Sequence, residues 1–361
     1  MRKNRKNEAV VGIEEEKSYK TNEEIIASWD LNKVNVVYDL DGVPVPVPKG
    51  YVGSSVADEK RINTGFVIYE GETEVDEANL FNEQQTRNQW VWVPVNDLSR
   101  IYEEDENGKK YGKTYVFSAT GRTLRTGSNA KREPKILTNY DNEKYFSENG
   151  MQGMTRNKFL QRMQIDFEST IKSIEKYGGF YIGRYETGDL SKKVPVVKKM
   201  NTDIHSQTWY AMYSKMEYLG ANRNIKSNMI WGCLWDETLE WLVESGNKTY
   251  EEIRVDSTSW GNYSDSTFTY TTTSGSTSTK NEGSRTIIPT GSSEYTKANN
   301  IYDMAGNVDD CTLEAHITYY RYSRCGDYYG TGSNNPSSNR NNNSPGVSSQ
   351  YCGARAYFII L

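Results

Sequence analysis

The chain has 361 residues, of which 35% are hydrophobic, and a formal net charge of −5 at pH 7. This length accommodates one large domain or two ordinary ones, and the low apolar content implies that much of it forms loops. The mild acidity, without a basic stripe, argues against nucleic-acid binding, and no apolar run approaches the roughly 18 residues of a membrane span. The first 30 residues lack the apolar stretch of a signal peptide, so no export signal is expected in them.

The N-terminal part predicts an extension followed by strands. Residues 1–55 are expected to form an N-terminal extension or connector, charged and loose or helical up to residue 30, and residues 56–361 the main domain. Strands are predicted at residues 34–41, 64–69 and 89–95, with an edge strand or extended connector at 45–50, a loop at 70–88, and insertions near 103–150 and 256–285.

Helical periodicity is clearest over residues 158–176, which precede a strand-like segment at 180–186. The side chains expected to face the core are Phe159, Met163, Phe167, Ile171 and Ile174. A glycine pair at 178–179 would end this helix. A second helix is predicted from about Thr208, and a third is predicted to open at Asp236, a favourable N-cap residue.

Cysteine and histidine are too sparse to predict a metal centre or a cofactor site. The four cysteines (Cys233, Cys311, Cys325 and Cys352) show no CxxC spacing, and His205 and His316 are the two histidines of the sequence. Cys233 lies between two tryptophans and is expected to be a buried structural thiol. We therefore predict no cofactor, no metal and no histidine-based catalysis.

The C-terminal tract has an unusual composition. Residues 315–360 contain no Lys, Glu, Leu, Met or Trp, and are rich in Tyr, Ser, Gly and Asn. These four residue types dominate antibody binding loops, where Tyr gives rigid contact area and the others give adaptable hydrogen bonds. The composition alone would also suit a disordered tail. Because the tract ends in the strand-like run 354–361, we expect a binding surface held between core strands.

Several segments, in the correct order, resemble the formylglycine-generating-enzyme-like branch of the C-type lectin fold. They are WVWVPV at 90–95, FYIGRYE at 180–186, TWYAM at 208–212, WDETLEW at 235–241, YDMAGNV at 302–308, RCG at 324–326 and GAR at 353–355. The resemblance covers about residues 88–361. It implies an α+β chain with the C-type lectin fold, long insertions and a short N-terminal extension.

The chain departs from that family at two places. Asp309-Asp310-Cys311 replaces the Trp-acidic-Trp sequence that usually follows Gly-Asn-Val. The oxidase members carry two copper-binding cysteines after their Arg-Gly-Gly motif, at places that correspond to about Gly330 and Asn335. Two neighbouring thiolates suit Cu(I), and their absence here implies that the chain is not an enzyme.

A narrower resemblance is to the variable proteins of diversity-generating retroelements, including phage tropism determinants, which share this fold. In them, adenine-directed mutagenesis of AAY codons rewrites a C-terminal segment, and substitution of such codons cannot produce Lys, Glu, Met or Trp. The resemblance implies a variable region at about 316–357, with Cys325 and Cys352 as chance outcomes rather than a disulfide. It also implies a protein or glycan ligand on a cell surface, and display on a phage virion or a bacterial cell.

The predicted ligand-binding residues share one expected exposed face. They are His316, Ile317, Tyr319, Tyr320, Tyr322, Asp327, Tyr328, Tyr329, Ser344, Val347, Ser349, Gln350 and Tyr351. Tyr357, inside the final strand-like run, is instead expected in the core.

Two other hypotheses remain at this point. One is a metal-dependent oxidase like the formylglycine-generating enzymes, and the other is a lectin-like adhesin whose loops are fixed and bind glycan, with or without calcium. The coding DNA distinguishes them from the variable-protein hypothesis, because only that one requires a near-repeat differing at adenines beside a reverse transcriptase gene.

Overall fold

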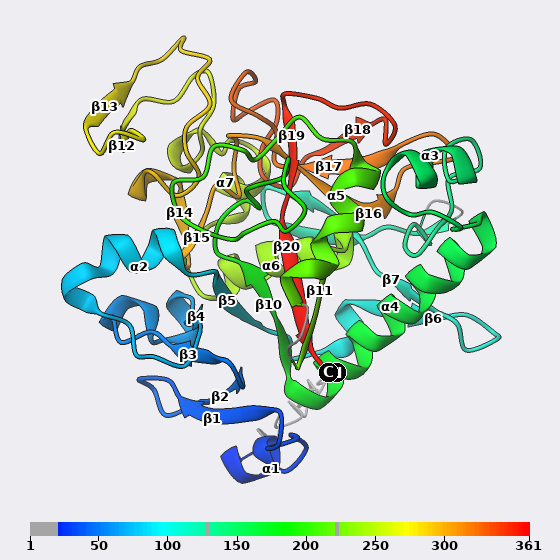
Figure 1. The fold of residues 1–361 in the computed structure, drawn as a ribbon, viewed down its shortest axis with the longest axis horizontal. Coiled ribbons are helices and arrows are strands. Elements are labelled where there is room, and N and C mark those ends of the chain that lie inside the picture. The colour runs from blue at the N-terminus through cyan, green and yellow to red at the C-terminus, as the bar shows by residue number, and fades with distance from the viewer. Residues whose placement is uncertain (1–20, 128–129, 221–223) are drawn as a thin grey trace, which may run out of the picture.

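A computed structural model describes residues 21–127, 130–220 and 224–361, so most of the predicted charged leader lies outside the described residues (Figure 1). Its centre is a six-stranded sheet in the order β11-β20-β10-β5-β4-β3. The strands are β3 (Tyr51–Gly53), β4 (Val67–Glu70), β5 (Gln89–Pro94), β10 (Gly179–Gly183), β11 (Ile225–Met229) and β20 (Ala356–Ile360). The last strand of the chain therefore lies inside the sheet, where Phe358 is opposite both Tyr181 and Ser227.

The two best-marked helices form where the sequence predicts them. Helix α4 (Arg156–Tyr177) buries all five predicted core side chains, and Gly178 ends it in the left-handed conformation with φ of 85°. Helix α5 (Trp209–Met216) begins at Thr208, whose hydroxyl accepts a hydrogen bond from the Ala211 amide. Helix α4 covers the sheet where the Thr170 hydroxyl meets that of Tyr357, at 2.8 Å, so Tyr357 is a core residue as predicted.

The third helix starts earlier than predicted. Helix α6 (Gly232–Glu244) begins four residues before Asp236, which is fully buried in its second turn and does not cap it. The amides of Gly232 and Cys233 donate instead to the Glu133 carboxylate, at 2.7 and 2.6 Å. The prediction failed because this cap comes from a residue about 100 positions away. Cys233 is buried, as expected.

A second, four-stranded sheet carries the Tyr- and Asn-rich tract at the upper end of the molecule in Figure 1. Its order is β18-β17-β16-β19, formed by β16 (Asp309–Ala315), β17 (Arg321–Arg324), β18 (Arg340–Asn343) and β19 (Cys352–Ala354). Strands β16, β17 and β18 pair antiparallel, and β19 runs parallel to β16. Because β19 leads directly into β20, the tract is attached to the main sheet at its far end.

The predicted loops and insertions contain more regular structure than expected. The remaining elements are α1 (Asn22–Ile26), β1 (Val34–Tyr38), β2 (Pro44–Pro48), α2 (Leu80–Thr86), β6 (Tyr102–Glu104), β7 (Lys110–Gly112), β8 (Tyr115–Ser118), β9 (Gly121–Leu124), α3 (Glu143–Glu148), α7 (Tyr250–Arg254), β12 (Phe268–Thr271), β13 (Thr277–Lys280), β14 (Lys297–Ala298) and β15 (Ile301–Tyr302). The predicted loop at 70–88 thus contains a helix, and the serine- and threonine-rich insertion contains the β12–β13 hairpin. Strand β3, within the predicted connector, forms one edge of the main sheet.

The predicted fold class is confirmed: the chain is α+β, with antiparallel strands and a C-terminal strand that returns to the middle of the sheet, as in a C-type lectin-like fold. Across the described ranges, none of the helices combines the length and apolar character needed to span a bilayer.

Candidate ligand-binding surface

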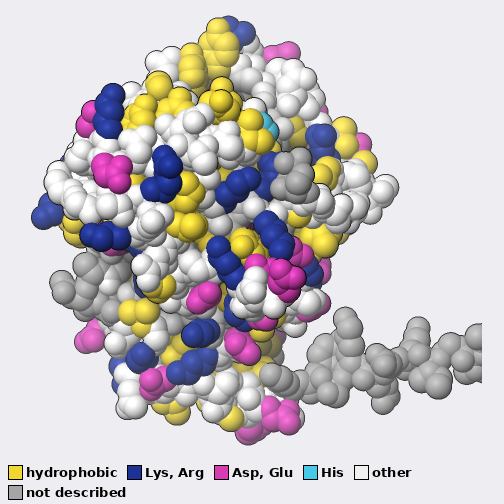
Figure 2. Space-filling model, turned by 90° about the vertical axis from the view of Figure 1, so that its right-hand side faces the viewer, with side chains coloured by type: hydrophobic (Ala, Val, Ile, Leu, Met, Phe, Trp, Pro, Cys, Tyr) yellow, Lys and Arg dark blue, Asp and Glu magenta, His cyan; other side chains and the backbone are white. Residues whose placement is uncertain are grey.

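Apart from Tyr322, the predicted binding residues lie on three connections of the four-stranded sheet: 316–320 between β16 and β17, 325–339 between β17 and β18, and 344–351 between β18 and β19. Six of them are exposed, namely Ile317, Tyr319, Tyr320, Tyr329, Val347 and Gln350. Six are half-buried, namely His316, Asp327, Tyr328, Ser344, Ser349 and Tyr351. In Figure 2 this upper end of the molecule gathers side chains of the hydrophobic class, which includes tyrosine.

Tyr322 does not belong to the exposed face, so its prediction is wrong. Its side chain is only 6% exposed and its hydroxyl accepts a hydrogen bond from the Arg132 guanidinium. The guanidinium groups of Arg132 and Arg125 also lie over its ring, at 5.2 and 5.6 Å from the ring centre. Tyr322 lies on β17, where alternation along the strand turns its ring towards the insertion at 103–150 rather than towards solvent.

The aromatic side chains form two groups. In the first aromatic cluster, the His316 ring lies 5.0 Å from Tyr322 and 6.2 Å from Tyr320, and Tyr319 lies 6.3 Å from Tyr320. Burial and the nearby charges of Arg132 and Arg125 lower the pKa of His316, which favours the neutral imidazole.

The second aromatic cluster consists of Tyr328, Tyr329 and Tyr351. The Tyr351 ring lies 5.8 Å from each of the other two rings, although it is more than 20 residues away in the sequence. The Asp327 carboxylate accepts hydrogen bonds from the amides of Tyr329 and Gly330, at 2.7 and 3.2 Å, and fixes the turn that carries two of the rings.

Beneath the surface, a buried ionic network ties the tract to helix α6. The Asp236 carboxylate accepts from Arg324 at 2.8 Å and from Arg340 at 2.5 Å, and Arg340 also reaches Glu314 at 3.0 Å. The Tyr115 amide donates to Asp236 as well, at 2.7 Å. These bonds lower the pKa of Asp236 despite its burial, so it stays ionised and holds both arginines.

The asparagine-rich stretch is held by its side-chain amides. Asn339 donates to the side-chain oxygens of Asn335 and Asn341, at 3.0 and 2.9 Å. Asn341 donates in turn to the Asp309 carboxylate at 3.1 Å, and the Asn343 amide contacts the Cys352 sulfur at 2.6 Å. The stretch is therefore an ordered part of the sheet and its connections.

Gly330 and Asn335, the places at which the resemblance to the oxidases would put cysteines, lie side by side. A Cβ added at Gly330 would lie 2.6 Å from the Asn335 side-chain nitrogen, so these two positions adjoin in space and hold no thiol. The four cysteines are free and buried elsewhere. Asp310 forms a buried ion pair with Arg355 at 3.0 Å.

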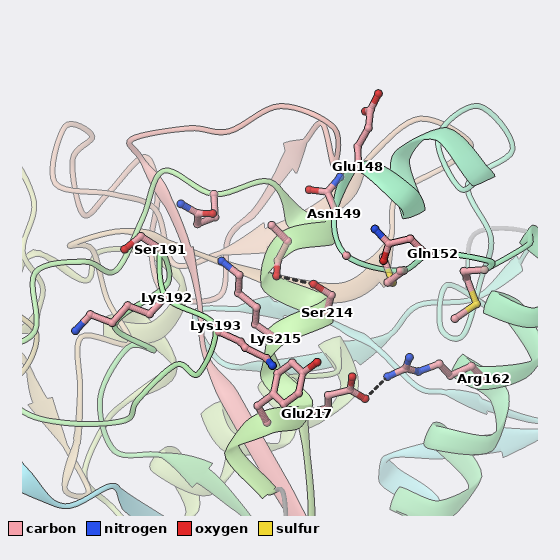
Figure 3. A pocket seen from close by; sticks show the side chains of 16 residues that line it. Glu148, Asn149, Gln152, Arg162, Ser191, Lys192, Lys193, Ser214, Lys215 and Glu217 are labelled. Atoms are coloured by element: carbon pink, nitrogen blue, oxygen red, sulfur yellow. Dashed lines mark hydrogen bonds and ion pairs between the residues drawn. The ribbon is translucent and has the colours of Figure 1, made fainter.

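Figure 3 shows a cavity of about 770 Å³. It is lined by residues of α4, α5 and the connections 148–154 and 191–193, and its lining includes no residue of the tract 316–357. Its charged groups are largely engaged: Arg162 pairs with Glu217 at 2.6 Å, and Lys215 donates to the Leu190 carbonyl at 2.6 Å. Among the described residues, no group of three or more His, Cys, Asp or Glu is arranged to hold a metal ion.

Three residues at or beneath this surface are not predicted by the sequence patterns. Arg340 stands inside an asparagine run, Asp309 is only a departure from a resemblance, and Arg285 lies in a predicted insertion. For Arg340 a signal existed, since a single arginine within a polar run is unlike its neighbours. For Asp309 and Arg285 the sequence offers none, because their contacts are distant in the chain.

No family model and no curated protein matches this sequence. Solved structures with a similar chain path include Treponema denticola variable protein 1, which is 15% identical with a TM-score of 0.27, over 91% of this chain and 92% of that one. CarF is 12% identical with a TM-score of 0.33, over 51% of this chain and 87% of its own. PvdO from Pseudomonas aeruginosa is 16% identical with a TM-score of 0.33, over 51% and 81%. At these values the likeness concerns the chain path and not a shared activity.

Proposed function

We propose that this protein is a non-catalytic, hypervariable ligand-binding protein that a retroelement diversifies. It displays a Tyr-, Ser-, Asn- and Gly-rich face on a C-type lectin scaffold, and its ligand is a protein or glycan of a cell surface. Display on a phage virion or a bacterial cell belongs to the same proposal.

The proposal rests on one observation: within one short segment, some side chains are buried and hold the fold, while others are exposed to solvent. Between residues 316 and 351, the arginines at 321, 324 and 340 point inward to carboxylates, whereas Tyr319, Tyr320 and Tyr329 are 37–48% exposed. The exposed residues of such a segment can be replaced without loss of the buried ion pairs that hold the segment to the rest of the protein. Fixed scaffolds with functional loops are the usual way in which one fold serves many ligands.

The decisive experiment is to sequence the DNA that surrounds the coding region. We expect a near-repeat of the segment for residues 316–357, differing at adenines and lying beside a reverse transcriptase gene. The codons of Tyr319, Tyr320 and Tyr329 should align with AAY codons of the repeat.

The buried arginines provide an internal control. The codons of Arg321, Arg324 and Arg340 should be identical in the repeat, because replacement would leave buried carboxylates unpaired. Absence of any repeat would overturn the proposal, and so would a repeat that varies the arginine codons as freely as the tyrosine codons.

A further inference from the structure

The second aromatic cluster combines tyrosine rings with negative charge. Asp309 is the first residue of β16, and its amide donates to the Tyr351 carbonyl at 2.8 Å. Asp327 lies in the turn that carries Tyr328 and Tyr329. Burial is the main cause that raises the pKa of Asp309, and the nearby negative charge of Asp327 raises it further.

Among the residues that the structure describes, neither carboxylate meets a cationic side chain. Asp309 accepts from Asn341 and Ser323, and Asp327 from two backbone amides. Within the described part of the chain, no ion pair forms with either of them, although the buried carboxylates of the neighbouring network all meet arginines. Burial raises the pKa of Asp309 to about 7, so Asp327, half-buried in the surface turn, is the carboxylate that remains for a ligand.

One cation of the protein already lies on this cluster. The guanidinium carbon of Arg285 lies 3.8 Å from the centre of the Tyr329 ring, which is the stacking distance of a cation–π contact. Arg285 is exposed and forms no ion pair with Asp327 among the described residues. The contact shows that the Tyr329 ring can stack with a guanidinium group.

We propose that the second aromatic cluster binds an arginine side chain presented by a protein ligand. A planar guanidinium can stack on tyrosine faces while it donates to a carboxylate, which a lysine ammonium does less well. The inference rests on the proposed function, since it specifies one part of the ligand for the same face. Tyr351 and Tyr329 would supply the stacking surface, and Asp327 the charge.

The test uses the full chain and two small probes, N-acetylarginine amide and N-acetylcitrulline amide, which have nearly the same shape but differ in charge. Ligand-observed NMR titration should give at least tenfold tighter binding of the arginine probe, weakened by added salt. Equal binding of the two probes, or no binding of either, would overturn the inference.

Three variants locate the site. Asp327→Asn should weaken binding of the arginine probe at least fivefold, whereas Tyr38→Ser, at an exposed tyrosine of β1 outside the binding face, should leave it unchanged. Arg285→Ala should strengthen binding severalfold, because it frees one face of Tyr329 and removes a competing charge. A loss of binding in Arg285→Ala, or equal losses in Asp327→Asn and Tyr38→Ser, would contradict the assignment. Thermal unfolding of each variant shows whether the fold is intact.

The inference and the proposed function fail separately. If the probes do not discriminate but the DNA repeat is present, only the arginine preference is wrong. If the repeat is absent, the proposed function is wrong whatever the probes show.

Discussion

Arg340 shows how one residue can belong to a variable-looking segment and yet be fixed by its surroundings. Its guanidinium joins two buried carboxylates, Asp236 on α6 and Glu314 on β16, and together with Arg324 it offsets the cost of burying those charges. Asn342, two residues further on the same strand, is exposed. The two positions thus differ in environment although both lie in the same asparagine run.

Replacing Arg340 by Ala should lower the free energy of unfolding by about 3 kcal/mol, because it leaves buried carboxylates without one of their partners. The matched change Asn342→Ala should alter it by no more than about 0.5 kcal/mol. Urea unfolding of the two variants measures the difference. Similar values for both would show that the ionic network does not anchor the tract.

The tyrosines of the binding face should be replaceable without loss of the fold. Changing the exposed Tyr319, Tyr320 and Tyr329 together to Ser should shift the melting temperature by only a few degrees, since exposed substitutions usually cost within about 0.5 kcal/mol each. Val308→Asp, at a fully buried position, should instead cost about 3 kcal/mol or more by burying an unpaired charge. If the tyrosine variant unfolds, those side chains are core residues and the face is wrongly assigned.

At the scale of elements, the asparagine-rich stretch behaves as part of a sheet. Strand β18 pairs along its whole length with β17, from Arg340 opposite Arg324 to Asn343 opposite Arg321. Before it, the amides of Asn335 and Asn339 donate to the carbonyls of Thr331 and Pro336, at 3.0 and 2.7 Å. The cost of ordering this backbone, roughly 1–2 kcal/mol per residue, is thus met before any ligand binds.

Hydrogen exchange should therefore find protected amides within residues 334–343 of the free protein. The β18 amides that face β17 should exchange slowest, and the exposed Asn334 amide faster. Exchange of the whole stretch at the rate of an unfolded peptide would contradict a preformed face and favour a disordered tail.

At the scale of the whole molecule, buried carboxyl groups should set the pH dependence of stability. Burial raises the pKa of Glu133, Glu237 and Asp309 to about 7, and that of Asp310 to about 6. Between about pH 4 and pH 7 the folded state therefore keeps protons that the unfolded chain has released. Under that condition the free energy of unfolding falls as the pH rises. Asp236, whose pKa is lowered, loses its contribution only at lower pH.

The melting temperature should accordingly fall by roughly 5 °C or more between pH 5 and pH 8. Glu133→Gln keeps the acceptor for the α6 amides but removes one of the titrating groups, so its melting temperature should depend less on pH than that of the unchanged protein. Calorimetry at several pH values measures both. A melting temperature that rises from pH 5 to pH 8 would contradict the predicted sign.

The sequence by itself determined the elements whose signals are local. Helix α4 has its five core residues and a glycine stop within one stretch, and α5 has its own threonine cap, so both could be predicted closely. The final strand could be predicted because an uninterrupted apolar run must enter a core. The candidate surface could also be predicted, because the unusual composition of residues 315–360 can be seen without knowledge of the rest of the chain.

Only the tertiary structure decided which residues of that surface face solvent and which hold it in place. Tyr322 and Tyr320 are two positions apart and look alike in sequence, yet one is buried against Arg132 and the other is exposed. Aspartate is a residue type that often caps helices, but Asp236 instead accepts hydrogen bonds from two arginines near the end of the chain. The physical reason is that burial and ion pairing depend on groups 80 to 200 residues away, which local propensity cannot represent.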